Sequence, residues 1–182
     1  MDCNRGLISD ISFIPSPNHN QRPSGTKVDL LVIHNISLPP GEFGGDGISQ
    51  CFTNQLNANE HPYYAEIIDL RVSAHALIRR DGTVMQYVPF HRRAWHAGIS
   101  SFQGRENCND FSIGIELEGN DALPYEFIQY QQLIILTKAL LSVYPCIALN
   151  RIVGHSDIAP GRKTDPGSSF DWPRYRQGIT GD

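Results

Sequence analysis

Two histidines and one aspartate in this sequence form a combination that is typical of a catalytic zinc site. His34 ends one apolar segment, His155 follows a second, and Asp165 lies ten residues further along the chain. Three ligands of this kind leave the fourth tetrahedral position of zinc open for water, whereas structural sites usually have four ligands. The chain contains seven histidines, and a single histidine is more often packed than metal-bound. The spacing alone therefore leaves both interpretations open.

Two further residues could act on a substrate beside such a site. Glu116 lies on the polar face of an alternating segment, next to Gly114, which leaves space for a neighbouring group. Lys163 lies two residues before Asp165 in a polar loop. The alternatives are a solvated strand face for Glu116 and an ordinary surface position for Lys163. We expect Glu118, on the same face as Glu116, to be solvent-exposed.

The segments that carry these residues have the patterns of β-strands. Residues 28–35 (VDLLVIHN) are apolar at almost every position, which is typical of a strand covered on both faces. Residues 111–119 (FSIGIELEG) alternate between apolar and polar side chains. Residues 73–80 and 83–88 flank the turn sequence Asp-Gly, which favours a hairpin.

The remaining segments predict helices packed on a sheet. Residues 126–144 have apolar side chains at spacings of three and four, and Pro145 ends this helix. A short strand is expected at residues 151–154 and a short helix at residues 173–177. Without a repeat or linker, the sequence predicts one α/β domain over residues 1–182, a central mixed β-sheet flanked by α-helices.

Composition and charge exclude several classes of protein. With 40% hydrophobic residues and a net charge of −4, the chain is typical of a folded globular protein. Its acidic balance argues against a nucleic-acid partner, because phosphate binding depends on clustered Lys and Arg. No segment approaches the roughly 20 apolar residues of a membrane span, so we expect no membrane association.

The cysteines and the start of the sequence suggest a location. Cys3, Cys51, Cys108 and Cys146 are scattered, without a CxxC motif. Residues 1–10 lack the apolar run of a signal peptide. We therefore expect free thiols and a cytoplasmic protein.

Several unusual segments together resemble one family. They occur in order between about residue 16 and about residue 174 and read VIHNISLPPGEFGG, SAHALIRRDG, VPFHRRAWHAG, CNDFSIGIELEG and GHSDIAPGRKTDPG. They resemble the AmpD-type N-acetylmuramoyl-L-alanine amidases and, more distantly, phage lysozyme-type amidases and peptidoglycan recognition proteins. The resemblance implies a central mixed sheet with helices on both sides and a zinc ion in a cleft at one edge.

The resemblance also implies an activity and roles for five residues. Zinc would be bound by His34, His155 and Asp165, with Glu116 as the catalytic glutamate and Lys163 as the lysine that stabilises the transition state. The reaction would be hydrolysis of the amide between the lactyl group of (1,6-anhydro-)N-acetylmuramic acid and L-alanine of the stem peptide. In the cytoplasm, the substrates would be soluble muropeptides released during peptidoglycan turnover, so the expected role is recycling.

Substrate contacts are less determined by the sequence. Muropeptides carry carboxylates, and Arg71 is the best candidate to bind one. Asn35, next to a predicted ligand, could hydrogen-bond the peptide, and Trp95 could provide a flat wall, although a packed core position fits Trp95 equally well. His75 and His96 are interpreted as pocket or core histidines and not as ligands.

Two other classes of function remain as alternatives. One is a non-catalytic muropeptide-binding or sensor domain, which the loss of a zinc ligand, the glutamate or the lysine would favour; all five residues are present. The other is a regulatory protein that binds another enzyme, and the sequence neither supports nor excludes protein partners of this kind.

Overall fold

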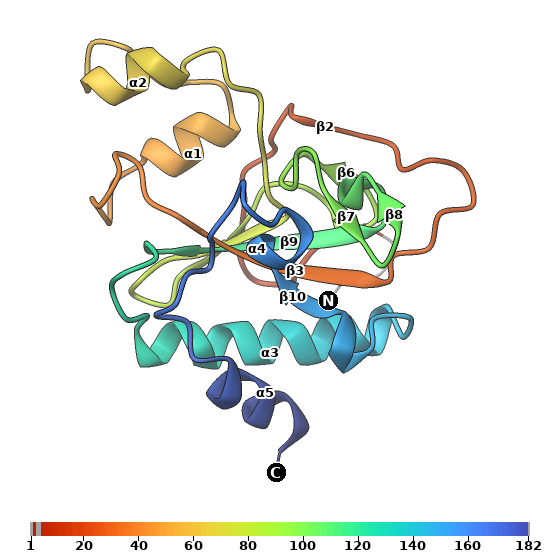
Figure 1. Ribbon diagram of the computed structural model, residues 1–182. Coiled ribbons are helices and arrows are strands. Elements are labelled where there is room, and N and C mark those ends of the chain that lie inside the picture. Colours follow the sequence, from red (N-terminus) through yellow and green to blue (C-terminus); the bar gives the residue numbers. More distant parts are fainter. Residues whose placement is uncertain (1, 3–4, 182) are drawn as a thin grey trace.

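The fold is built on a six-stranded mixed β-sheet (Figure 1). A computed structural model of the chain describes residue 2 and residues 5–181. The six strands, in sequence order, are β1 (Ser12–Phe13), β3 (Leu30–Ile36), β4 (Ala76–Ile78), β5 (Val84–Gln86), β9 (Ser112–Glu118) and β10 (Ile152–Gly154). Their spatial order is β1-β5-β4-β9-β3-β10, and only the β4–β5 pair is antiparallel. The predicted α/β fold with a central mixed sheet is confirmed.

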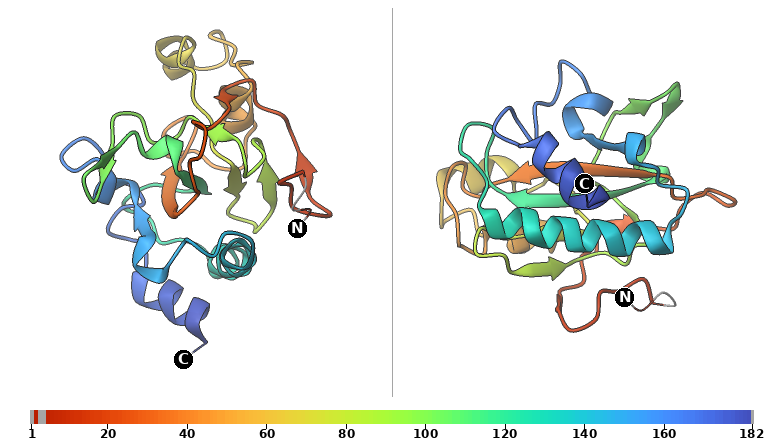
Figure 2. Two further views of the ribbon diagram at one scale, coloured as in Figure 1. Left: turned by 90° about the vertical axis from the view of Figure 1, so that its right-hand side faces the viewer. Right: turned by 90° about the horizontal axis from the view of Figure 1, so that it is seen from below.

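Helices cover both faces of this sheet (Figures 1 and 2). The long α3 (Phe127–Val143) lies across one face, and α5 (Trp172–Thr180) packs against α3 and β10. The short α1 (Gly47–Phe52) and α2 (Pro62–Ile67) lie over the opposite face, and α4 (His155–Ile158) directly follows β10. Within the described residues, no helix has both the length and the apolar character needed to cross a membrane.

Several short elements complete the fold. Two-residue strands form two small antiparallel pairs, and two 3-10 helices connect larger elements. They are β2 (His19–Asn20) with β6 (Arg93–Ala94), β7 (Ser101–Phe102) with β8 (Arg105–Glu106), η1 (Cys108–Asp110) and η2 (Leu149–Arg151). The sequence did not predict them, because two or three residues are too few for a periodic pattern.

The two central strands are buried on both faces, as predicted for residues 28–35. Leu31 and Ile33 of β3 pack with Ile115 of β9 in the core under α3. Leu30 and Val32 point to the opposite face and pack in a separate cluster. Burial on both faces explains why β3 is apolar throughout, except where it reaches His34.

The register of the parallel strands determines which polar residues meet. His34 of β3 pairs with Glu116 of β9, and Ile33 pairs with Gly154, the last residue of β10. His155 is the next residue along the chain. Because neighbouring parallel strands end at the same edge of a sheet, His155, His34 and Glu116 lie next to one another at that edge.

The two predicted helices on the α3 face begin at identifiable caps. The first was expected over residues 126–144 and is observed as Phe127–Val143. Gln129 Oε1 accepts from the backbone N–H of Glu126 at 3.0 Å, which satisfies one donor at the helix start. In α5, Asp171 Oδ1 accepts from Arg174 N at 3.0 Å, and Pro173 occupies the first turn.

The sequence did not predict α1 and α2. Both have only six residues, and α1 begins at the end of a segment rich in glycine and proline. The cap of α2 is His61, whose Nδ1 accepts from Tyr63 N at 3.1 Å. Histidine is not among the usual N-cap residues, so this start had no recognisable signal.

The described cysteines are free thiols, as expected. Cys51 and Cys108 are buried, and Cys146 is exposed. Burial raises the pKa of Cys51 to about 11, which keeps it protonated at neutral pH. Cys3 lies outside the described residues.

The expectation that Glu118 is solvent-exposed is wrong. Its side chain is only 3% exposed, because β9 is covered on the face that the sequence suggested was open to solvent. Glu118 Oε1 accepts from Gly44 N at 2.6 Å, and Oε2 accepts from Arg80 N at 3.0 Å. The carboxylate therefore joins the loop before α1 to the β4–β5 hairpin.

Replacing Glu118 should consequently destabilise the protein. In Glu118→Gln, one carboxylate oxygen becomes an NH₂ group that faces a backbone donor, which leaves a buried donor without an acceptor. We expect the free energy of unfolding to fall by about 1–3 kcal/mol, measured by urea denaturation. Glu106→Gln, at an exposed position in β8, is the control and should stay within about 0.5 kcal/mol of the parent protein. Equal stability of both variants would contradict this role.

Candidate metal and active site

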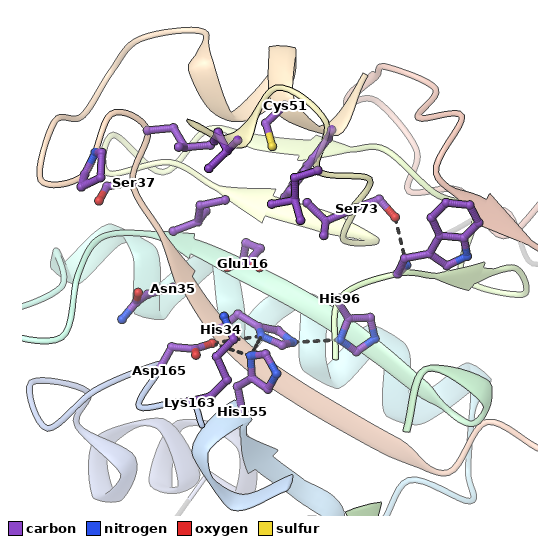
Figure 3. Close-up of a pocket in the computed structure, with 18 of the residues that line it drawn as sticks. His34, Asn35, Ser37, Cys51, Ser73, His96, Glu116, His155, Lys163 and Asp165 are labelled. Carbon is purple, nitrogen blue, oxygen red and sulfur yellow. Dashed lines mark hydrogen bonds and ion pairs between the residues drawn. The ribbon is translucent and has the colours of Figure 1, made fainter. Parts of the chain in front are cut away.

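Three side chains converge on one point at the edge of the sheet (Figure 3). His34 Nδ1 lies 3.0 Å from His155 Nδ1 and 3.0 Å from Asp165 Oδ2, and His155 Nδ1 lies 3.1 Å from the same oxygen. His34 ends the buried part of β3, His155 begins α4, and Asp165 lies in the following loop. The fold therefore brings together the three residues that the sequence suggested as metal ligands.

Hydrogen bonding on the outer side of His155 fixes the orientation of its ring. His155 Nε2 lies 3.0 Å from the carbonyl oxygen of Ala97. A carbonyl oxygen can only accept, so the neutral ring carries its proton on Nε2 and a lone pair on Nδ1. That lone pair faces Asp165 Oδ2. Two such acceptors repel each other unless a cation or a proton lies between them.

His34 is held in a similar way by a second histidine. His34 Nε2 lies 2.9 Å from His96 Nδ1, and His96 Nε2 lies 3.1 Å from Ser112 Oγ. In this arrangement, His34 Nε2 donates its proton to His96 Nδ1, and His96 Nε2 donates its proton to Ser112 Oγ. The lone pair on His34 Nδ1 therefore also points at the shared centre. Burial lowers the pKa of His34 to about 4, so its ring is neutral at physiological pH.

This donor set fits a small divalent cation. It consists of two imidazole nitrogens and one carboxylate oxygen, all mutually close, and each imidazole makes a hydrogen bond through its other nitrogen. Metal-binding histidines usually have such an outer hydrogen bond, which fixes the tautomer and the direction of the ligand. The described residues therefore contain a group that could hold a metal.

Glu116 lies beside His34 in an unusual environment. It is 8% exposed, and its Oε2 is buried without a hydrogen-bond partner. Burial, reinforced by repulsion from the Asp165 charge, raises the pKa of Glu116 well above its usual value, and the positive charge of Lys163 opposes this rise. A buried carboxyl with a free oxygen next to a metal-ligand set can exchange a proton with a bound reactant.

These residues line one pocket with a volume of about 340 Å³. Lys163 lines this pocket and is exposed at its rim, close to Asp165 (Figure 3). Apolar side chains, among them Leu38, Phe52 and Tyr63, also line it. A concave site with apolar walls and a few convergent polar groups is typical of a pocket for a small ligand.

Comparison with known proteins identifies the family. Residues 24–168 match the family described as N-acetylmuramoyl-L-alanine amidase. The chain belongs to this family. The amidase is 59% identical over 180 residues to the 1,6-anhydro-N-acetylmuramyl-L-alanine amidase AmpD of Citrobacter freundii. The match covers 99% of this chain and 96% of the relative. The predicted class of enzyme, a hydrolase of the AmpD type, is confirmed.

Solved structures agree with this assignment. The amidase superimposes on the crystal structure of a selenomethionine AmpD derivative with a TM-score of 0.93 and 59% identity, over 96% of this chain and 97% of the other. A complex of the N-acetylmuramyl-L-alanine amidase AmiD from E. coli with the substrate anhydro-N-acetylmuramic acid-L-Ala-D-γ-Glu-L-Lys has a TM-score of 0.61 and 31% identity. That match covers 87% of this chain and 60% of the AmiD chain.

The three residues suggested as substrate contacts lie around the pocket of the amidase, but they differ in exposure and in hydrogen bonding. Trp95 is half-buried and lines the pocket, and its Nε1 donates to Asn20 Oδ1 at 3.2 Å. Asn35 lies at the pocket edge, but its Nδ2 donates to Asp121 Oδ1 at 2.7 Å. Arg71 is exposed and lines an adjoining cavity that also contains Trp95 and Lys163.

Sequence reasoning did not identify the outer partners of the two histidines. His96 was interpreted as a pocket or core residue, and the structure shows it in direct contact with His34. Ala97 contributes only its carbonyl group, and a backbone acceptor leaves no signal in the residue type. The spacing of His96 and Ala97 from His34 and His155 gave no indication of either contact.

Metal binding by the amidase should depend on each of the three converging residues. His34→Ala, His155→Ala or Asp165→Ala removes one of three ligands, so we expect bound metal to fall well below one ion per chain. Dialysis against a divalent metal followed by elemental analysis measures this. His91→Ala, at an exposed histidine, should keep its metal. Full occupancy in His34→Ala would mean that the ion binds elsewhere.

Proposed function

We propose that this chain is a zinc amidase that hydrolyses the amide between the lactyl group of 1,6-anhydro-N-acetylmuramic acid and L-alanine of the stem peptide. The observation that carries this proposal is the triangle of His34, His155 and Asp165 next to the free buried oxygen of Glu116. The name of the AmpD relative supports the anhydro sugar, and the substrate in the AmiD complex has the same sugar and first residue.

In this proposal, His34, His155 and Asp165 hold the zinc ion. Two neutral imidazoles and one carboxylate leave the ion with a net charge of about +1. Zinc bound in this way supplies Lewis acidity, which acidifies water and polarises an amide carbonyl. Three protein ligands suit such a catalytic role, because a fourth would close the site.

Glu116 and Lys163 perform the remaining chemistry. Glu116 accepts a proton from the attacking water through its free carboxylate oxygen and returns it to the departing alanine nitrogen. The ammonium group of Lys163 stabilises the negative charge that develops on the carbonyl oxygen. Both residues line the same pocket as the metal-ligand triangle, so one bound amide can reach all of them.

We further propose that the rim of the pocket recognises the rest of the substrate. Arg71 binds a carboxylate of the stem peptide, Trp95 provides a flat surface for the sugar or peptide, and Asn35 hydrogen-bonds the peptide. In the structure, Asn35 Nδ2 donates to Asp121 Oδ1. To bind the peptide, the Asn35 amide must either give up this hydrogen bond or use its remaining donor and acceptor.

The proposed substrates are soluble muropeptides in the cytoplasm, and the role is recycling of peptidoglycan fragments. The sequence had left a non-catalytic binding or sensor domain as the alternative, and membership of the amidase family argues against it. The free oxygen of Glu116 favours catalysis, because a binding site that only holds a ligand has no need for an unpartnered buried carboxyl, which costs free energy.

The reaction itself can be tested by mass spectrometry. Zinc-loaded protein is incubated with anhydromuramyl tripeptide in ¹⁸O-labelled water. We expect free tripeptide and an anhydromuramic acid that carries one ¹⁸O atom in its lactyl carboxylate, because water attacks that carbonyl. Soluble fragments should be cleaved much faster than intact polymeric peptidoglycan. Intact tripeptide substrate after incubation would contradict the proposed reaction.

Glu116→Gln separates proton transfer from metal binding. The amide cannot accept a proton at neutral pH, so we expect kcat to fall by about 10²–10⁴, with little change in KM. The variant should keep its zinc, since Glu116 is not one of the converging ligands. Steady-state kinetics and elemental analysis measure both, and Glu106→Gln is the matched exposed control. Near-full turnover, or loss of zinc together with activity, would contradict the assignment.

A further inference from the structure

We propose that Asn109 is a positioning residue for the metal site. It fixes the segment formed by His96 and Ala97, and this segment orients the rings of His34 and His155. The inference rests on the proposed role of these two histidines as metal ligands.

One oxygen of Asn109 holds two successive backbone amides. Asn109 Oδ1 accepts from His96 N at 3.0 Å and from Ala97 N at 2.8 Å. Both amides lie beyond the end of β6, so the side chain of Asn109 takes the place of a neighbouring strand as their acceptor. Asn109 is 7% exposed and belongs to η1, which only Phe111 separates from Ser112, the first residue of β9.

The segment held in this way contacts both histidines. The ring of His96 meets His34 Nε2 at 2.9 Å, and the carbonyl oxygen of Ala97 meets His155 Nε2 at 3.0 Å. Two adjacent residues therefore provide the outer hydrogen bond of each imidazole ligand. A shift of this short segment would move both rings together.

The surroundings leave His96 little freedom to move. A Cβ atom on Gly114 would lie 2.4 Å from His96 Cγ, so β9 needs glycine at this point to admit the ring. Asn109 is itself anchored, because Arg22 Nη1 donates to the carbonyl oxygens of Asn109 at 3.0 Å and Asp110 at 2.9 Å. The positioning contacts thus extend from the half-buried Arg22 to the metal-facing nitrogens.

The expected effect follows from the geometry of an imidazole ring. Nε2 and Nδ1 are parts of one rigid ring, so losing the contact at Nε2 lets Nδ1 turn away from the shared centre. Loss of the outer partner of a metal-binding histidine typically weakens metal affinity by about 10- to 100-fold. Asn109 supports both of these partners, so its loss should produce an effect in this range.

The test compares variants with and without the acceptor. Asn109→Leu removes the oxygen, whereas Asn109→Asp retains one that both amides can share. His96→Leu removes the ring nitrogen that meets His34, whereas His96→Asn places an amide oxygen near the position of Nδ1. We expect zinc affinity, measured by competition with a chromophoric chelator, to fall by about 10- to 100-fold in the two leucine variants. It should return to within a few-fold of the parent in Asn109→Asp and His96→Asn.

Two further measurements distinguish positioning from a general loss of structure. The visible spectrum of bound Co²⁺ reports ligand geometry, and it should change in the leucine variants only. Thermal unfolding in excess chelator shows whether each metal-free variant is folded. Asn57→Leu and His91→Leu, both at exposed positions, are the matched controls. If Asn109→Leu does not fold, Asn109→Ala, which also removes the oxygen but adds no bulk, takes its place in each comparison.

The outcomes separate this inference from the proposed function. Parent-like zinc affinity and Co²⁺ spectrum in folded Asn109→Leu would overturn the inference, as would equal weakening in Asn109→Leu and Asn109→Asp. If either of these results is found while His34→Ala loses the metal, the proposed metal site stands and only the positioning role fails. If His34→Ala binds zinc like the parent, the metal-site assignment fails first.

Discussion

The parallel pairing of β3 with β9 and β10 is the constraint on which the site depends. Because these strands run in the same direction and pair in one register, His34 lies next to Glu116 and next to the end of β10, where His155 begins α4. A shift of one residue in either pairing would turn a side chain to the opposite face. The apolar residues under α3 oppose such a shift, so the core of the sheet also keeps the chemical groups in place.

The sequence predicted the parts of the fold that have long or regular patterns. The continuous apolar run before His34 predicted the buried β3, and the spacing of apolar residues before Pro145 predicted α3 to within one residue at each end. Short elements such as α2, which His61 caps, had no pattern of sufficient length. The residues suggested as metal ligands were identified by their types and by resemblance to a family, and their meeting in space required the strand register.

Other features lay beyond sequence reasoning for a physical reason. Glu118 lies on an alternating strand, and alternation predicts a polar face without saying whether a loop covers that face. Here the loop containing Gly44 covers it, and the carboxylate accepts backbone hydrogen bonds in place of water. Likewise, nothing in the residue type of Asn109 indicates that its amide oxygen bonds two backbone groups 12 and 13 positions away.

The sequence separation within the triangle would link the proposed metal binding to the folding equilibrium. His34 is 121 positions from His155 and 131 positions from Asp165, so the unfolded chain contains no preformed site. An ion that binds only the native state stabilises it by about 2.7 kcal/mol when its free concentration is 100 times Kd. The availability of metal in the cell would then set the lifetime of the amidase against proteolysis as well as its activity, and a metal-starved cell would hold fewer copies of the folded enzyme.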